Sequence, residues 1–189
     1  MILTLDAPPL ANILGFLALV GYIVTLLSTI LKIVFPQTRK TGISTWLLHH
    51  RRLIGLSSFS LSVVHGIFFI NQRNIDLFDL TTHEIYFQGV IPFVILILMA
   101  ITSNHWSVKI LKKNWKNLHR LTYLAMFLLI WHIWDKMSGH WTYLTPLGLG
   151  AITGISVLFL IRLWIEHDAK QQKIKKKEYQ ASLLVDSNQ

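Results

Sequence analysis

The chain has 189 residues, of which 52% are hydrophobic, a formal net charge of +9 and no cysteine. Without cysteine it can form neither a disulfide nor a thiolate-ligated iron–sulfur cluster. It also contains no glycine-rich loop of the GxGxxG or GxxxxGKS type that would hold a nucleotide. Because most residues lie in long apolar runs, we expect no separate soluble catalytic domain, and any soluble redox module would be another protein.

Five apolar segments have the length and composition of membrane spans. They cover residues 10–35, 53–70, 87–103, 118–134 and 143–165. The first is too long for a cleavable signal peptide and lacks a basic n-region, so we interpret it as a retained helix. Pro92 is expected to kink the third. The sequence therefore predicts an all-α membrane protein, with a bundle of about five transmembrane helices over residues 1–168 and a basic cytoplasmic tail over residues 169–189.

The positions of the basic residues predict how this bundle is oriented. They gather in the loop after the first span, the loop after the third span, and the tail: Arg39, Lys40, Arg51, Arg52, Lys109, Lys112, Lys113, Lys116, Lys170, Lys173, Lys175, Lys176 and Lys177. In a five-span topology these regions face one side, which the positive-inside rule identifies as the cytoplasm. We therefore expect an external N-terminus, a cytoplasmic C-terminus and an external loop over residues 71–86. The charge indicates orientation and contact with anionic lipid, not nucleic-acid binding.

Two histidines lie at matching distances along the second and fourth spans. His65 follows Arg51 by 14 residues in HHRRLIGLSSFSLSVVHGIFF, and His132 follows His119 by 13 residues in NWKNLHRLTYLAMFLLIWH. Each interval corresponds to about 20 Å of helix, so we expect both imidazoles at the same depth on two parallel spans. The axial positions of a b-type heme require one imidazole on each face of the porphyrin. Heme iron would also offset the cost of burying an imidazole in hydrocarbon.

Each of these histidines also has a simpler interpretation. A single intramembrane histidine is most often hydrogen-bonded to a neighbouring helix. The matched depth of His65 and His132 favours heme for the pair. His119 is open, because 13 residues turn an ideal helix by about 220° beyond whole turns, so His119 and His132 need not share a face. It could bind a second heme with another partner, contact a flavin or quinone, or donate a hydrogen bond to a carbonyl.

Arg51 and Arg52 lie near the predicted cytoplasmic boundary. Their simpler role is to anchor the helix by extending the guanidinium group to the interface. The functional alternative is binding a heme propionate or a flavin phosphate, because a guanidinium group can donate to two oxygens at once.

Three stretches of the sequence resemble one family of membrane proteins. RRLIGLSSFSLSVVHGIFF, the ITS at residues 101–103 and NWKNLHRLTYLAMFLLIWH are similar to the ferric-reductase-like transmembrane domain, and most similar to its bacterial members that are heme-binding membrane subunits of methionine sulfoxide reductase systems. The resemblance covers residues 46–134, and its most specific part is LHRL with a second histidine 13 residues later. It implies a bundle that encloses heme, with His65, His119 and His132 at the family's histidine positions.

The sequence departs from the two-heme pattern of more distant relatives, the NADPH oxidases. Where their second histidine helix carries an inner heme ligand, this chain has Arg51 or Arg52. We therefore expect one bis-histidine heme b, and we interpret His49 and His50 as solvated side chains at the interface. The resemblance also permits flavin mononucleotide.

The function expected from these observations is that of an electron-transfer cytochrome in a bacterial inner membrane. Electrons would come from a cytoplasmic flavin, a reductase or quinol and leave to an external acceptor, with redox partner proteins on either side. Two alternatives stay open: a self-sufficient surface reductase of ferric iron or quinone, and a heme-free membrane assembly protein that has kept the fold.

Overall fold

The structure is a computed structural model, and it describes residues 9–73, 80–136 and 142–186. In those residues all regular structure is helical. The elements are α1 (Leu10–Val34), η1 (Pro36–Arg39), α2 (Ile43–Arg73), α3 (Leu80–Ile101), α4 (His105–Leu111), α5 (Lys113–His119), α6 (Leu121–Lys136) and α7 (Leu144–Asp186). The predicted all-α class is thus confirmed.

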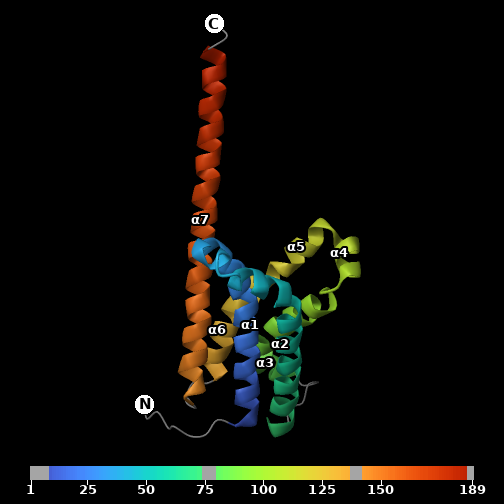
Figure 1. The fold of residues 1–189 in the computed structure, drawn as a ribbon. Helices are drawn as coiled ribbons and strands as arrows, with labels where there is room; N and C mark the ends of the chain where they lie inside the picture. Colours follow the sequence, from blue (N-terminus) through green and yellow to red (C-terminus); the bar gives the residue numbers. More distant parts are fainter. Residues whose placement is uncertain (1–8, 74–79, 137–141, 187–189) are drawn as a thin grey trace.

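The long helices pack side by side in a ring (Figure 1). α1 packs along both α2 and α7, α6 packs along α7 and α3, and α3 touches α2. One end of the bundle carries η1, α4, α5 and the projecting C-terminal half of α7, while the first turn of α1 and the start of α7 lie at the other end (Figure 1). The basic residues of these connecting segments and of the tail therefore share one end, which we call the basic end.

The buried core is formed by four of the helices. Its members are Leu19, Tyr22, Leu26 and Ile30 of α1, Ile95 of α3, Ala125 and Met126 of α6, and Ile152, Ile155 and Phe159 of α7. Large apolar side chains on the outward faces stay exposed, including Leu17, Val64, Phe127, Leu160 and Trp164. An apolar belt of this kind is typical of a surface that faces lipid rather than water.

α2 is held against α1 by small residues. The Ser58 hydroxyl donates a hydrogen bond to the carbonyl oxygen of Ala18 over 2.7 Å. A Cβ on Gly21 would lie 3.0 Å from the Cβ of Ser58, so the two backbones approach closely here. Small residues at a helix interface permit this approach in membranes, where the hydrophobic effect does not drive helices together.

The five expected spans are only partly recovered. By length and composition three described helices can cross a membrane, Leu10–Val34, Ile43–Gln72 and Leu144–Gln180. A fourth span requires that Phe87–Ile101 and His105–Leu111 be taken together, although they are bent by 98°. α6 has 16 residues, which rise about 24 Å against a hydrocarbon core of about 30 Å.

Several predicted boundaries differ from the structure. The second expected span, 53–70, lies inside the much longer α2, and α3 begins before the expected residue 87, so the expected loop over 71–86 is mostly helical where it is described. Pro92 lies inside α3, and the kink expected there stays a prediction. α7 continues from the last expected span through most of the predicted tail without a break.

Candidate functional site

His65 is oriented by the first turns of α1. Its Nδ1 lies 2.8 Å from the carbonyl oxygen of Ala11. A carbonyl oxygen only accepts, so Nδ1 carries a proton, and in the neutral ring Nε2 is then the nitrogen with the lone pair. The same edge of the ring covers Gly15, where an added Cβ would lie 3.0 Å from both Cε1 and Nδ1. Metal-bound histidines are commonly oriented by such a hydrogen bond from the nitrogen that does not bind the metal.

His132 has a corresponding position between α6 and α3. Its ring covers Gly89, where an added Cβ would lie 2.9 Å from Cε1, 3.1 Å from Nδ1 and 3.7 Å from Nε2. Nε2 is thus the ring nitrogen that lies farther from Gly89. Next to it, the ring of Trp131 meets Phe87 of α3 edge to face, with centroids 5.4 Å apart.

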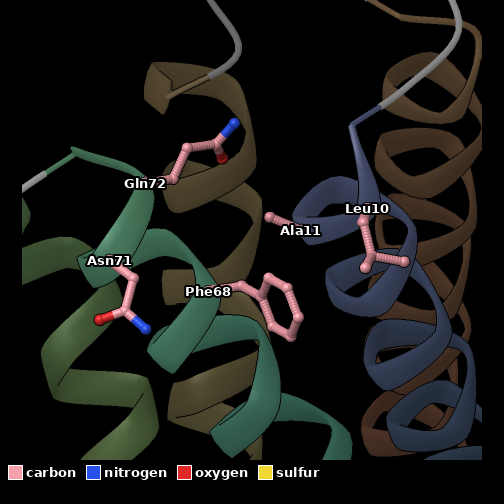
Figure 2. Close-up of a pocket in the computed structure, with 5 residues that line it drawn as sticks. All are labelled: Leu10, Ala11, Phe68, Asn71 and Gln72. Atoms are coloured by element: carbon pink, nitrogen blue, oxygen red, sulfur yellow. The ribbon is translucent and has the colours of Figure 1, made fainter.

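The two histidines lie toward the same end of the bundle. His65 lies against Gly15, which comes five residues after the first residue of α1, or about 7.5 Å along the helix axis. His132 comes four residues before the last residue of α6, or about 6 Å along that helix. Both helix ends lie opposite the basic end (Figure 1). An open pocket of about 380 Å³ lies there between α1 and α2. Leu10 and Ala11 of α1 line one side of it, and Figure 2 shows Ala11 pointing toward α2. Phe68, Asn71 and Gln72 of α2 complete its lining.

A second cavity, of about 280 Å³, lies toward the basic end. It is lined by residues of α1, α2, α3, α4 and α5, and we call it the basic cavity. Its lining includes three histidines and two arginines: His49, Arg51, Arg52, His105 and His119. No carboxylate is part of this lining as the structure describes it. The cavity is therefore suited to an anionic or electron-rich ligand.

His119 lies at the end of α5, outside the helices that can span the membrane. Its Nε2 is 3.4 Å from Oγ1 of Thr102, and its ring lies against that of Trp115, with centroids 4.1 Å apart and the planes tilted by 32°. The Trp115 indole in turn donates to the carbonyl oxygen of Thr102 over 3.0 Å. Desolvation, with a smaller contribution from the charge of Arg51, lowers the pKa of His119 below its usual 6.5. At neutral pH the ring is therefore uncharged and keeps a lone pair.

The two arginines differ in their surroundings. Arg51 is half-buried and Arg52 is exposed. In the part of the chain that the structure describes, the only carboxylate–arginine bridge is Arg162 with Glu166, so Arg51 has no described acid partner. His49, which the sequence suggested was only a solvated side chain, is exposed but also lines the basic cavity.

The structure thus separates the predicted residues into two groups. His119, Arg51 and Arg52 share the basic cavity, while His65 and His132 lie toward the opposite end, each against a glycine. α5 ends at His119 and α6 begins at Leu121, so the helix is interrupted where the sequence predicted a continuous one. Within the described residues, no group of three or more His, Cys, Asp or Glu is placed to hold a metal ion.

Four further residues were not predicted from the sequence. Gly15, Gly89, Thr102 and Trp115 contact the predicted histidines. Thr102 belongs to the ITS stretch, so its place in a family motif was a usable signal. The glycines carried none, because glycine is frequent in membrane helices and its neighbours depend on packing.

Comparison with known proteins identifies relatives over most of the bundle. Residues 14–130 match the family described as "Ferric reductase like transmembrane component". The chain is 32% identical over 120 residues to the protein-methionine-sulfoxide reductase heme-binding subunit MsrQ of Brucella melitensis biotype 2, a match that covers 61% of this chain and 51% of that protein. The subunit of the same name from Herminiimonas arsenicoxydans is 34% identical over 125 residues, or 63% of this chain and 56% of that protein.

These matches have two limits along the chain. The chain spans about half the length of these curated relatives, and no solved structure is detectably similar to it. The family match includes His65 and His119 and ends two residues before His132. Since the match covers more than half of the sequence and the helices have the length and composition of membrane spans, the chain is an integral membrane protein that belongs to the ferric reductase-like transmembrane component family.

Proposed function

We propose that this chain is a b-type cytochrome that carries electrons across the membrane, with one heme held between His65 and His132. The observation that carries the proposal is the matched placement of the two imidazoles. Both lie toward the same end of the bundle, and in both the Nδ1–Cε1 edge covers a glycine of a neighbouring helix. We propose Nε2 of each ring, the nitrogen farther from the glycine, as the ligand of iron.

The residues present fit this cofactor. His65 donates its Nδ1 proton to a backbone carbonyl, which makes Nε2 a better ligand. The names of the relatives, heme-binding subunits, support heme, and they do not mention a flavin. When bound, the heme supplies one-electron chemistry, and the protein contributes its binding, its orientation and its polarity.

The basic cavity is the proposed place of electron uptake. A cytoplasmic reductase, quinol or flavin mononucleotide would donate there, close to His119 and Trp115, and Arg51 would attract an anionic group of the donor. Arg52 is exposed, and its proposed role is to anchor α2 at the membrane interface.

The proposed topology places the basic end in the cytoplasm and the N-terminus outside. It requires five crossings in the inner membrane of a bacterium, of which α6, with 16 residues, is the shortest. Membrane lipid would cover the exposed apolar belt. The acceptor would be an external redox partner protein, by analogy with relatives that are named as subunits of a reductase.

An optical spectrum of the purified protein tests the proposal. We expect a low-spin b-type spectrum that His65→Ala and His132→Ala each abolish or convert to high spin while the protein still inserts. His167→Ala, on the exposed part of α7, is the matched control and should leave the spectrum unchanged. Normal low-spin spectra in both ligand variants would overturn the assignment, and absence of heme from the wild-type protein would favour the assembly role.

A second assay separates the cytochrome subunit from the self-sufficient reductase. The purified protein is supplied with a reductant and a soluble ferric chelate, with no other protein present. We expect reduction of the heme but little turnover of the chelate. Rapid turnover would support the self-sufficient reductase.

A further inference from the structure

We propose that Gly15 and Gly89 are positioning residues that orient the imidazoles of His65 and His132. Each glycine lies on a helix that supplies no proposed ligand, α1 for His65 and α3 for His132. The contact between glycine and ring is independent of any cofactor. Its consequence for a bound heme rests on the function proposed above.

At Gly15 two contacts from α1 act on one edge of the His65 ring. A Cβ built on this glycine would lie 3.0 Å from Cε1 and Nδ1 and 3.4 Å from Cγ of His65. Real Cβ atoms rarely show contacts this short, so a methyl group here would displace the ring by a few tenths of an ångström. The displacement would act on the same edge that donates to the Ala11 carbonyl over 2.8 Å. Glycine at this position therefore permits the hydrogen bond that fixes the tautomer of His65.

At Gly89 the contact is closer. A Cβ would lie 2.9 Å from Cε1 of His132, a separation that real Cβ atoms essentially never show. The ring would have to rotate, or α6 would have to move away from α3. Because the main core of the bundle already fixes α6 through Ala125 and Met126, which are fully buried, rotation of the ring is the expected response.

The other described glycines show that this arrangement is specific. A Cβ on Gly21 would meet Ser58, one on Gly148 would meet apolar side chains of α1, and Gly66, Gly150 and Gly154 have nothing within 4 Å. Within the described part of the chain, only Gly15 and Gly89 face a histidine. Gly66 is especially useful, since it follows His65 directly and has open space around it.

The first test compares the electron paramagnetic resonance spectra of the oxidised holoprotein and four variants. The orientation and hydrogen bonding of axial imidazoles tune the electronic structure of heme iron. We expect Gly15→Ala and Gly89→Ala each to shift the low-spin g values or to add a high-spin signal. Gly66→Ala and Gly154→Ala should match the wild type. Unchanged spectra in both Gly15→Ala and Gly89→Ala would overturn the proposal for the heme.

A double-mutant cycle tests the contact itself and needs no heme. Thermal unfolding in detergent is followed for Gly89→Ala in the wild-type and in the His132→Ala background. We expect the alanine to lower the Tm only where the imidazole is present. Without the ring the alanine should leave the Tm unchanged or raise it, because alanine is the better helix former. An equal loss of Tm in both backgrounds would show that Gly89 acts through the backbone and would overturn the proposal.

The same cycle with Gly15→Ala and His65→Ala completes the test. If the purified protein carried no heme, the proposed function would fail while the two cycles still reported on the glycine–histidine contacts. If the wild-type spectrum were that of a low-spin heme but neither cycle showed coupling, the function would stand and the positioning role would fail.

Discussion

The hydroxyl of Tyr22 on α1 donates a hydrogen bond to the backbone carbonyl of Thr122 in the first turn of α6. The Thr122 hydroxyl returns a bond to the Tyr22 oxygen over 3.2 Å. α1 is also tied to α2 by the bond from Ser58 to Ala18. Through these bonds α1 connects the helix that carries His132 with the helix that carries His65, although neither histidine belongs to α1.

The first prediction concerns this bond. Tyr22→Phe removes a buried hydroxyl and should lower the free energy of unfolding by about 0.5–1.5 kcal/mol, the usual net worth of one hydrogen bond. Thermal or chemical unfolding in detergent measures the change. Tyr143→Phe is the matched control, because Tyr143 is exposed, and it should have almost no effect. Equal losses in the two variants would contradict the role given to the Tyr22 bond.

The sequence was informative wherever hydropathy and charge act along a single helix. α1 begins and ends within a residue of the expected span 10–35, because an unbroken apolar run is bounded there by prolines and polar residues. The start of α2, ten residues before the expected residue 53, could not be predicted in this way. An apolar run ends where the chain leaves the membrane, whereas a helix can continue beyond that point because its backbone hydrogen bonds do not depend on hydropathy. α7, which continues from the apolar span into the polar tail, shows the same behaviour.

The candidate site was predicted only for the residues that carry chemistry. A histidine in an apolar span is conspicuous, so His65, His119 and His132 could be singled out. What each ring contacts depends on which helix lies beside it. Gly15 is 50 residues from His65, and Gly89 is 43 residues from His132. No single-helix periodicity connects residues that far apart, so these contacts could be identified only from the packing.

The second prediction concerns topology. The chain has no native cysteine, so single cysteines can be introduced without background labelling. A cysteine at position 78, which lies outside the described residues, should react with an impermeant reagent in intact cells. One in place of Lys113, at the start of α5, should react only after the membrane is opened. The reverse pattern would place the basic end outside the cell.

The third prediction concerns the pH dependence of stability. The pKa of His119 is lowered in the folded protein, so the unfolded state takes up a proton first as the pH falls through 6.5. The unfolded state then binds more protons, and stability is lost on acidification. His119→Gln has no such proton to bind. Its free energy of unfolding relative to the wild type should therefore increase as the pH falls from about 8 to about 5.

A variant of the neighbouring arginine provides the control for this effect. The charge of Arg51 contributes to the lowered pKa of His119, so Arg51→Gln should raise that pKa toward its usual value. The pH-dependent difference caused by His119→Gln should become smaller in the Arg51→Gln background. If the difference in unfolding free energy between His119→Gln and its parent were independent of pH in both backgrounds, the pKa of His119 would be the same in the folded and unfolded states, and the prediction would be wrong.

The fourth prediction concerns the number of hemes and follows from the arginines of α2. A guanidinium group has no lone pair for iron, so at the level of the basic cavity α2 offers only the exposed His49 as a possible ligand. We therefore expect one heme per chain. Pyridine hemochrome analysis, combined with a quantitative protein assay, measures this ratio.

His119→Ala should retain most of the low-spin signal but slow reduction from the cytoplasmic side, since His119 lines the cavity where we propose electron uptake. The control is His105→Ala, which changes another histidine of the same lining but leaves the ring contact between His119 and Trp115 in place. Two hemes per chain, with half of the heme lost in His119→Ala, would instead assign His119 to a second axial position and make His49 its partner across the basic cavity.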